Sequence, residues 1–418
     1  MRVAVVGAGI IGVTTAYELA VLGHEVEVFE RRASVAAEGS FANAGVVAPG
    51  YVTPWAAPGM AWKVLRQMFG RDAAVRFAGP SALAELPWIF RWWLACRPRR
   101  HVVNRSAMQR LAHHSRERLL ELTRVLGLEY EQTPGYLVLL RSARDLQLAQ
   151  GGLRLLQELG VSHALVDAQR CRQLEPALNP DAPLHAAIHL PQDGVGNCRQ
   201  FAHQMRGESQ RHGARFRFDL AVRRIEPGTR PVLQTADGER REVDAVVVCA
   251  GADSGALLAP VGLKLPLAAI HGYSITAPLR HVDGPDATAP HAALMDERYK
   301  VAISRLGQRL RVAGSAELGG RLDDLRPAPL ATLYRVLEQW FPGAAMTQAA
   351  QHWKGARPML PDGPPVLGES GRPGVWLNLG HGSSGWALAC GSARVLAELI
   401  SGRAAPIDMT ALGISRLR

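Results

Sequence analysis

The sequence predicts an α/β protein that opens with a Rossmann-like βαβ unit, and three observations near the amino terminus support this. Residues 2–6 (RVAVV) form a β-branched run typical of a buried parallel strand. The glycine pattern GAGIIG at 7–12 follows directly, and residues 13–22 then carry the apolar spacing of a helix. A second strand, EVEVF at 25–29, is closed by the acidic residue Glu30. This order is the context in which GxGxxG binds a dinucleotide.

Each glycine of this turn has a physical task. Gly7 permits the tight turn, Gly9 lets a pyrophosphate approach the backbone, and Gly12 lets the helix pack closely on the strand. The start of the helix offers free N–H groups and a positive dipole end to the phosphates. The turn is therefore predicted to contact the dinucleotide through Gly7, Ala8, Gly9, Ile11 and Gly12.

The residues after the second strand bear on the kind of dinucleotide. The carboxylate of Glu30 would accept hydrogen bonds from ribose hydroxyls and would repel a 2′-phosphate. Arg31 and Arg32 leave the alternative of a phosphorylated ribose open. The glycine motif alone does not separate nicotinamide from flavin.

Length and composition limit the protein class. A chain of 418 residues predicts about two domains, and its composition excludes a collagen-like or disordered chain. The formal net charge is +11, but only four of the 48 basic residues are lysine, so part of this charge reflects an arginine bias. Five cysteines without a CxxC pair predict neither a disulfide framework nor a zinc site, and no other metal site is expected. The absence of a long apolar run predicts a cytoplasmic protein.

Further elements are visible later in the chain. Residues 244–250 (DAVVVCA) predict a buried strand that runs into Gly251. The turn at 237–238 (DG) between residues 232–235 and 241–243 predicts a hairpin. Residues 391–400 carry helical spacing and end before Gly402.

Several longer motifs are far more specific than GxGxxG. They are EGSFANAGVVAPGY at 38–51, PWAAPG at 54–59, QDG at 192–194, HGYS at 271–274, DERYKVAISR at 296–305, WKGARPM at 353–359, PDG at 361–363, and NLGHG at 378–382 with GW at 385–386. With these motifs the chain resembles the FAD-dependent amino acid oxidoreductases, the group of D-amino acid oxidase and glycine oxidase. It is most similar to the small subunits of bacterial D-amino acid dehydrogenases, and the resemblance spans essentially the whole chain.

The resemblance implies a Rossmann-like FAD-binding domain interleaved with an α+β substrate domain, as in D-amino acid oxidase. The FAD-binding domain would take residues 1–50, 165–262 and 350–418, and the substrate domain residues 51–164 and 263–349. The cofactor would be non-covalent FAD, since no cysteine lies in the loop at 380–385. Besides the glycine turn, its predicted contacts are Glu30, Arg31, Ser40, Asn43, Ala44, Gly45, Val46, Val222, Ala250, Gly251, Gly380, His381, Gly382, Ser383, Ser384 and Gly385.

The substrate carboxylate needs a cationic partner, and Arg357 is the candidate. A guanidinium binds a carboxylate through two hydrogen bonds, and GARPM is an apolar setting that does not suit a solvated arginine. The resemblance gives this arginine the same role; the alternative is a structural ion pair with Asp362. Tyr273 and Tyr299 are candidate donors to the same carboxylate or half-buried packing residues.

The loop before the last helix is the second candidate catalytic element. The N–H groups of residues 380–385 would face the flavin, where negative charge gathers on reduction. His381 is either a flavin contact or a loop histidine, and Ser383 and Ser384 also fit helix N-caps. Two positions depart from the dehydrogenase pattern: His271 stands where lysine is usual, and Lys354 where a threonine-like residue is usual.

The predicted reaction is oxidative deamination of D-amino acids to 2-oxo acids and ammonia. Hydride would pass from the α carbon to flavin N5, and the electrons to a quinone-type acceptor. The close alternative is an oxidase or dehydrogenase of glycine, sarcosine or a cyclic imino acid such as a D-hydroxyproline. A flavoprotein that binds tRNA and a non-catalytic scaffold are disfavoured, because no RNA-binding module is visible and Arg357 would lack a purpose. No nucleic-acid partner is expected.

The tryptophan-rich segment at 84–100 has two interpretations. Its aromatic residues stand next to Arg97, Arg99 and Arg100, a pattern typical of an interfacial helix. We hypothesise that it contacts the inner face of the cell membrane, where a quinone would be available. The alternative is a helix packed within the substrate domain.

Overall fold

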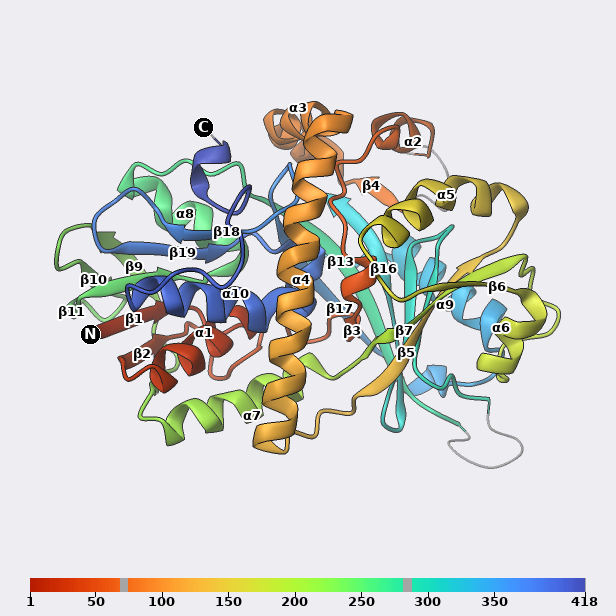
Figure 1. Ribbon diagram of the computed structural model, residues 1–418, viewed down its shortest axis with the longest axis horizontal. Coiled ribbons are helices and arrows are strands. Elements are labelled where there is room, and N and C mark those ends of the chain that lie inside the picture. The colour runs from red at the N-terminus through yellow and green to blue at the C-terminus, as the bar shows by residue number, and fades with distance from the viewer. Residues whose placement is uncertain (68–73, 281–287, 418) are drawn as a thin grey trace.

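Two large sheets lie on either side of one long helix (Figure 1). The computed structural model describes residues 1–67, 74–280 and 288–417. The first sheet has six strands in the order β18 (Val366–Glu369), β19 (Val375–Leu379), β12 (Ala245–Val248), β1 (Arg2–Val6), β2 (Glu25–Phe29) and β8 (Arg215–Arg217). A small sheet beside it contains β11 (Arg240–Glu242), β10 (Val232–Thr235) and β9 (Val222–Glu226).

The predicted βαβ unit forms the centre of the six-stranded sheet. β1 and β2 have the predicted bounds, whereas α1 (Ile10–Val21) begins inside the glycine motif, three residues before the predicted start at residue 13. β1 pairs in parallel with β2 on one side and with β12 on the other, with Val3 opposite both Val26 and Ala245. The apolar residues of β1 from Val3 onward are buried, which is why the run is β-branched rather than alternating.

The second large sheet has ten strands, eight of which follow one path. Their order is β17 (Gln351–Met359), β13 (Ala268–Pro278), β16 (Arg309–Leu318), β15 (Val301–Leu306), β14 (Ala293–Asp296), β5 (Thr133–Leu140), β7 (Ala186–Val195) and β3 (Val46–Val47). β4 (Val75–Phe77) pairs with β16, and β6 (Ala164–Asp167) with β7. Its core includes the fully buried Tyr273, Trp340 and Phe341.

Two strands lie in a different sheet from the one that the predicted division into domains implies. β7 and β17 fall in ranges predicted for the FAD-binding domain, yet both pair into the ten-stranded sheet. β17 leaves that sheet at Met359 and the chain re-enters the six-stranded sheet at β18. The predicted domain boundaries remain a prediction, and the chain crosses between the two sheets within residues 359–366.

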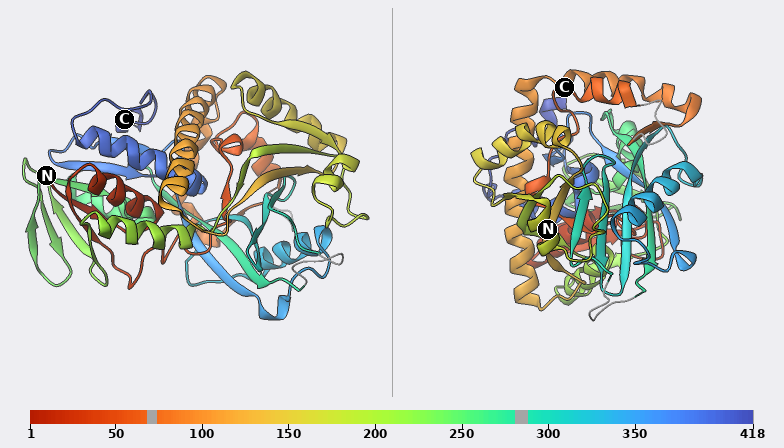
Figure 2. Two further views of the ribbon diagram at one scale, coloured as in Figure 1. Left: turned by 60° about the horizontal axis from the view of Figure 1, so that its bottom comes forward. Right: turned by 90° about the vertical axis from the view of Figure 1, so that its right-hand side faces the viewer.

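Helices cover the outer faces of the sheets (Figures 1 and 2). They are α2 (Met60–Gln67), α3 (Leu86–Ala95), α4 (Pro98–Leu126), α5 (Ala143–Glu158), α6 (Ala168–Leu174), α7 (Cys198–Arg211), α8 (Ser254–Leu258), α9 (Pro327–Trp340) and α10 (Gly385–Ile400). Helix α4 crosses one face of the molecule, over the junction of its two halves, and packs on α10 (Figures 1 and 2). None of the described helices is both long and apolar enough to cross a membrane.

The other local predictions can be compared with these bounds. β10 and β11 pair antiparallel around the turn at 237–238, as predicted. The last helix begins at Gly385, six residues before the predicted start. Its first residues, from Trp386 to Cys390, are all buried, so they lack the amphipathic spacing on which the prediction depended.

Candidate active site

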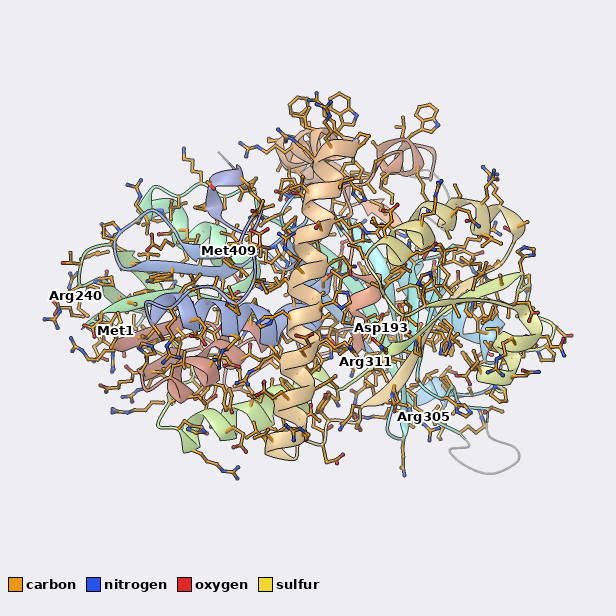
Figure 3. The ribbon with its side chains drawn as sticks, viewed as in Figure 1. Met1, Asp193, Arg240, Arg305, Arg311 and Met409 are labelled. Atoms are coloured by element: carbon orange, nitrogen blue, oxygen red, sulfur yellow. The ribbon has the colours of Figure 1, made fainter. Side chains whose placement is uncertain are left out.

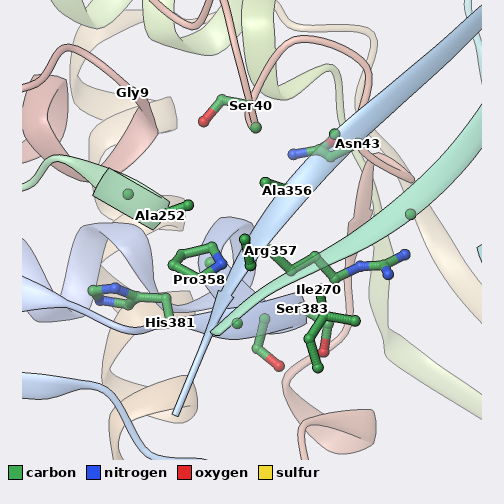
Figure 4. Close-up of a pocket in the computed structure, with 18 of the residues that line it drawn as sticks. Gly9, Ser40, Asn43, Ala252, Ile270, Ala356, Arg357, Pro358, His381 and Ser383 are labelled. Carbon is green, nitrogen blue, oxygen red and sulfur yellow. The ribbon is translucent and has the colours of Figure 1, made fainter. Parts of the chain in front are cut away.

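A cavity of 1260 Å³ lies between the two large sheets. Its walls come from the glycine turn and residues 29–55, from the ends of β9 and β12, from β13, β16 and β17, and from the loop before α10. Figure 4 shows the part around β17, where Arg357 and His381 point in opposite directions. One end of the cavity is therefore formed by the glycine turn and the other by strands of the ten-stranded sheet.

The glycine turn has the geometry that close approach of a dinucleotide requires. Gly7 has a φ of 103°, and a Cβ there would lie 2.6 Å from the carbonyl oxygen of Cys249. A Cβ on Gly12 would lie 1.8 Å from the carbonyl oxygen of Gly7. Both positions therefore exclude any side chain. The first turn of α1 contains no acidic residue, so nothing on the helix competes with a phosphate for its N–H groups.

Glu30 and the two arginines after it are held in a fixed arrangement. The carboxylate of Glu30 accepts hydrogen bonds from the N–H groups of Ala8 (2.7 Å) and Arg32 (2.9 Å), and it lines the cavity. Arg31 and Arg32 both pair with Glu38 at 2.6 Å, and Arg31 also pairs with Asp253 at 2.7 Å. Because both guanidinium groups are neutralised by carboxylates, the site does not favour a phosphorylated ribose.

Ser40 and Asn43 shape the segment that follows. The hydroxyl of Ser40 accepts a hydrogen bond from the N–H of Ile10 at 3.1 Å, and thus caps α1 from a distant part of the chain. The side-chain carbonyl of Asn43 accepts from the N–H of Gly45 at 3.0 Å. These contacts hold residues 40–46 against the start of α1, where they line the cavity.

Most of the predicted cofactor contacts come together around this cavity. Its lining includes Gly7, Gly9, Ile11, Glu30, Arg31, Ser40, Asn43, Ala44, Gly45, Val46, Val222, Ala250, Gly251, Gly380, His381, Gly382, Ser383, Ser384 and Gly385. Ala8 and Gly12 are not among the lining residues. Ala8 is fully buried with its N–H bound to Glu30, and Gly12 lies under the carbonyl of Gly7.

The loop before α10 differs from the expectation in two respects. Ser384 occupies the N-cap position of α10, but its side chain makes no capping hydrogen bond. Ser383 is not a cap either, because its hydroxyl accepts a hydrogen bond from the indole N–H of Trp55 at 3.1 Å. No side chain therefore caps the first N–H groups of α10, whose first residues line the cavity.

His381 is a buried neutral residue. Its Nε2 lies 3.1 Å from the hydroxyl of Ser392, a residue of helix α10. Burial lowers the pKa of His381 to about 3, so the imidazole carries no charge at neutral pH. Its ring contributes shape rather than charge to this wall of the cavity.

Arg357 lies at the opposite end of the cavity without a carboxylate partner among the described residues. One of its guanidinium nitrogens, Nη1, donates a hydrogen bond to the carbonyl oxygen of Ser315 at 2.9 Å. The ring of Trp55 lies 6.0 Å from the guanidinium carbon. Burial lowers the pKa of Arg357 to about 10, so the side chain stays protonated at neutral pH. The alternative ion pair with Asp362 is wrong, because Asp362 pairs with Arg416 at 2.8 Å.

Gly272 provides the space that Arg357 occupies. A Cβ on Gly272 would lie 2.2 Å from a guanidinium nitrogen of Arg357. We therefore expect Gly272→Ala to displace the guanidinium and to lower kcat/KM for amino acid substrates by on the order of tenfold or more. Steady-state kinetics on the FAD-loaded variant would measure this. Gly151→Ala is the matched control, since a Cβ at that helical position meets nothing within 4 Å.

Tyr273 is engaged in a buried polar cluster. Its hydroxyl donates to Glu317 Oε2 at 2.8 Å, and Lys354 Nζ donates to Glu317 Oε1 at 2.7 Å. Lys354 also donates to the carbonyl oxygen of Asp324 at 2.8 Å. Burial, together with the bond to Glu317, raises the pKa of Tyr273. Tyr273 and Lys354 line the cavity, but the donor proton of Tyr273 is committed to Glu317.

The second departure from the dehydrogenase pattern, His271, is placed differently. His271 is buried, lies opposite Glu317 in the register of β13 and β16, and does not line the cavity. Burial and the charge of Lys354 lower the pKa of its imidazole. Of the two departing residues, Lys354 is the one that borders the cavity.

Tyr299 does not fit the predicted role of a carboxylate donor in the cavity. It packs against the core of the ten-stranded sheet, and its ring lies 5.1–5.9 Å from the guanidinium carbons of Arg141, Arg298 and Arg335. Its neighbour Lys300 lines the cavity instead. Both residues stand in the turn between β14 and β15, where Lys300 has a φ of 53°. The motif borders the cavity, but the residue chosen from it does not.

Several cavity residues were not identified as functional candidates from the sequence. They are Tyr51, Trp55, Lys63, Lys300 and Ser315. Tyr51 and Trp55 stand in the motifs PGY and PWAAPG, which mark the segment as close to the cofactor. Ser315 contributes only its backbone carbonyl, for which the sequence carries no signal.

Comparisons with known proteins agree with this geometry. Residues 2–399 match the family model described as FAD dependent oxidoreductase. A D-amino acid dehydrogenase of Cereibacter sphaeroides is 42% identical over 420 residues, which cover 100% of this chain and 95% of that protein. A D-amino acid dehydrogenase of Rhizorhabdus wittichii is 41% identical over 422 residues and 100% of both chains. The structure of glycine oxidase from Geobacillus kaustophilus superposes with a TM-score of 0.75 at 21% identity, over 99% of both chains.

Proposed function

Because the chain belongs to the family of FAD-dependent oxidoreductases, we propose that it oxidises D-amino acids to imino acids, which water hydrolyses to 2-oxo acids and ammonia. When bound, FAD accepts a hydride from the substrate α carbon at its N5 atom. The glycine turn, Glu30 and residues 40–46 would hold this cofactor, and the N–H groups at the start of α10 would offer hydrogen-bond donors to negative charge on its ring.

One observation carries the substrate assignment. Arg357 is a half-buried guanidinium in the cavity, bound to one carbonyl and to no carboxylate of the described chain. A desolvated cation without a counter-ion is costly, and a bound carboxylate would repay that cost with two charged hydrogen bonds. An α-amino or α-imino acid supplies this carboxylate next to the carbon that is oxidised.

The test is anaerobic reduction of the enzyme-bound flavin by a panel of D-amino, L-amino and imino acids. We expect D-amino acids such as D-alanine to bleach the flavin absorption, and their L-enantiomers to leave it unchanged. If no amino or imino acid reduces the flavin, the proposed function is wrong.

The panel also separates the alternative substrates. Glycine, sarcosine and cyclic imino acids such as D-proline or a D-hydroxyproline would use the same carboxylate anchor. Lys354 borders the cavity where the dehydrogenase pattern has a smaller residue, which makes a shifted substrate preference worth testing. Faster bleaching by a cyclic imino acid than by D-alanine would favour that alternative.

We further propose that the electrons pass to a quinone at the inner membrane surface. Helix α3 carries exposed apolar side chains, Leu86, Phe90 and Trp93, which we call the α3 crest. Figure 3 shows aromatic rings projecting outward from this end of the molecule. The other face of the helix, with Trp88 and Trp92, lines the cavity.

The surroundings of the α3 crest support a membrane contact. Arg97, Arg99 and Arg100 are exposed at the start of α4, directly after α3. Trp62 of α2 is also exposed, by 63%. Exposed arginines next to exposed aromatic residues fit an anionic lipid surface, where the aromatic rings enter the interface and the guanidinium groups bind headgroups.

Vesicle flotation would measure this contact. We expect the wild-type protein to float with anionic vesicles and the double variant Phe90→Glu/Trp93→Glu to stay at the bottom. Insertion would bury the two new carboxylates in the lipid interface, and anionic headgroups would repel them. Leu148→Glu on α5 is the matched control, since Leu148 is 67% exposed and lies outside the crest. Wild-type protein that remains at the bottom would rule out the membrane proposal.

A further inference from the structure

A second polar cluster lines the part of the cavity that contains Arg357 and strands β13, β16 and β17, which we call the substrate half. The hydroxyl of Tyr51 donates a hydrogen bond to Glu297 Oε2 at 2.6 Å. Lys300 Nζ donates to the hydroxyl oxygen of Tyr51 at 2.9 Å and also to Glu297 Oε1. Tyr51 therefore has one remaining lone pair on its hydroxyl oxygen, and its proton already points at a carboxylate.

This cluster connects the cavity to the exterior. Tyr51 and Lys300 line the cavity, whereas Glu297 does not. The side chain of Glu297 is 24% exposed, so its carboxylate is accessible to solvent outside the cavity lining. The phenol thus stands between the inside of the cavity and a solvent-accessible carboxylate.

The cluster is also close to the carboxylate anchor. A Cβ on Gly314 of β16 would lie 3.1 Å from the carbonyl oxygen of Lys300, so Lys300 lies beside the residue that precedes Ser315. Ser315 is the residue whose carbonyl binds Arg357. Lys300 and Ser315 have positive φ values of 53° and 60°, an uncommon conformation for residues other than glycine. An amino acid held by Arg357 would have its α-amino group in this part of the cavity.

The charges here disfavour a protonated amine. Three of the four lysines in the chain, Lys63, Lys300 and Lys354, line this one cavity. The side chain of Lys63 makes no hydrogen bond or ion pair with any residue that the structure describes, and burial together with Lys300 lowers its pKa. Lys300 and Lys354 are paired with Glu297 and Glu317, so Lys63 and Arg357 are the cations that would chiefly lower the pKa of a bound substrate ammonium through like-charge repulsion.

Hydride transfer from an amino acid needs the neutral amine, so the ammonium must first lose a proton. Few described residues of the cavity can carry this proton away. The buried His381 is bound to Ser392, and Tyr273 is committed to Glu317. Glu30, Glu38 and Asp253 stand at the nucleotide end. Tyr51 is the hydroxyl in the substrate half whose hydrogen bond leads outward.

We propose that Tyr51 and Glu297 form the proton exit for the substrate ammonium. The ammonium N–H bond breaks as its proton moves to the Tyr51 oxygen, and the Tyr51 proton moves to the carboxylate of Glu297 and from there to water. The amine keeps the electron pair, and no oxidant takes part in this step. The inference rests on the proposed amino acid oxidation, since the proton originates from its substrate.

The groups that face this relay set the direction of its pH dependence. They are Lys63, Tyr136, Asp145, Asp193, Asp296 and Lys300. The lysines favour the neutral amine, so Lys300→Met should raise the pKa of the bound ammonium and move the acidic limb of flavin reduction to higher pH, by about one unit. If Glu297 acted only as a charge, its removal would move that limb to lower pH, because an anion stabilises the ammonium.

The experiment is rapid-mixing reduction of the flavin by D-alanine across pH in the FAD-loaded protein. For Glu297→Gln we expect reduction at neutral pH to slow by on the order of a hundredfold, and added acetate to restore part of the rate by acting as an external base. Tyr51→Phe should cause a similar loss. The double variant should lose no more than either single variant, because the two groups act in series.

Two control variants remove a charge that lies outside the proposed relay. Lys264→Met removes the exposed lysine outside the cavity, and Glu242→Gln removes an exposed carboxylate on β11; both should keep the wild-type profile. A Glu297→Gln profile that is unchanged, or that moves only to lower pH, overturns the inference while wild-type reduction upholds the proposed function. If Glu297→Gln does not retain FAD, the Tyr51→Phe profile decides in the same way. Wild-type flavin that no amino acid reduces overturns both.

Discussion

Replacement of Arg357 by alanine should raise KM for D-amino acids strongly and lower kcat/KM. The expected loss of binding free energy is ~2–5 kcal/mol. The guanidinium donates to one protein acceptor, the carbonyl of Ser315, and its other donors are available for a substrate carboxylate. Its removal leaves the substrate carboxylate in a half-buried, largely apolar cavity without a counter-charge. The same loss of orientation should also lower kcat, because the α carbon is no longer aimed at the flavin.

Steady-state kinetics with D-alanine would measure this effect, alongside the flavin spectrum to confirm cofactor loading. Arg372→Ala is the matched control, since Arg372 also donates to a main-chain carbonyl, that of Gly262, but is exposed and outside the cavity. Arg357→Lys should recover part of the affinity, because an ammonium keeps the charge and loses the two-pronged geometry. A KM for Arg357→Ala equal to that of wild type would remove Arg357 from the substrate site.

The Gly12→Ala variant should be isolated without FAD. A Cβ at position 12 would lie 1.8 Å from the carbonyl oxygen of Gly7, and both atoms belong to backbone that is fixed by β1 and α1. The clash can be relieved only by moving α1 away from the glycine turn, which moves the N–H groups that bind the pyrophosphate. Because the βαβ unit is the centre of the six-stranded sheet, the free energy of unfolding should fall as well.

The ratio of flavin to protein absorbance after purification would report cofactor loss, and thermal unfolding would report stability. Gly207→Ala in α7 is the matched control, because a Cβ there meets nothing within 4 Å. Alanine at this helical position should keep FAD and leave stability unchanged or slightly raised. Stoichiometric FAD in Gly12→Ala would contradict the assigned role of this glycine.

Much of the cofactor half was predictable from the sequence, because its chemistry depends on local constraints. The glycines of the turn, the strands around it and Glu30 follow one another within 30 residues, so spacing alone predicts their arrangement. The early start of α10 was missed for a physical reason, since Trp386 to Cys390 are buried on all sides and show no periodicity.

The substrate half was less predictable, because its contacts join distant strands. The resemblance placed the segment at 296–305 in the site, but Tyr299 and Lys300 stand in the turn between β14 and β15. Which of them faces the cavity depends on how that turn packs against distant residues, so Tyr299 was chosen where Lys300 lines the wall. The bond between Lys354 and Glu317 joins residues 37 positions apart on β17 and β16. The role of Gly272 depends on where the guanidinium of Arg357 lies, which no local pattern encodes.

The order of strands in the six-stranded sheet has a consequence for how the protein matures in the cell. β1 pairs with β12, and β12 pairs with β19, so strands from the first, middle and last parts of the chain stand next to each other. The loop at 380–385 that completes the cavity lies roughly 370 residues after the glycine turn. During synthesis the glycine turn therefore lacks these neighbours until the loop at 380–385 has also left the ribosome. Such long-range pairing makes assembly slow, and flavin capture is a late event that a carboxy-terminal truncation would prevent.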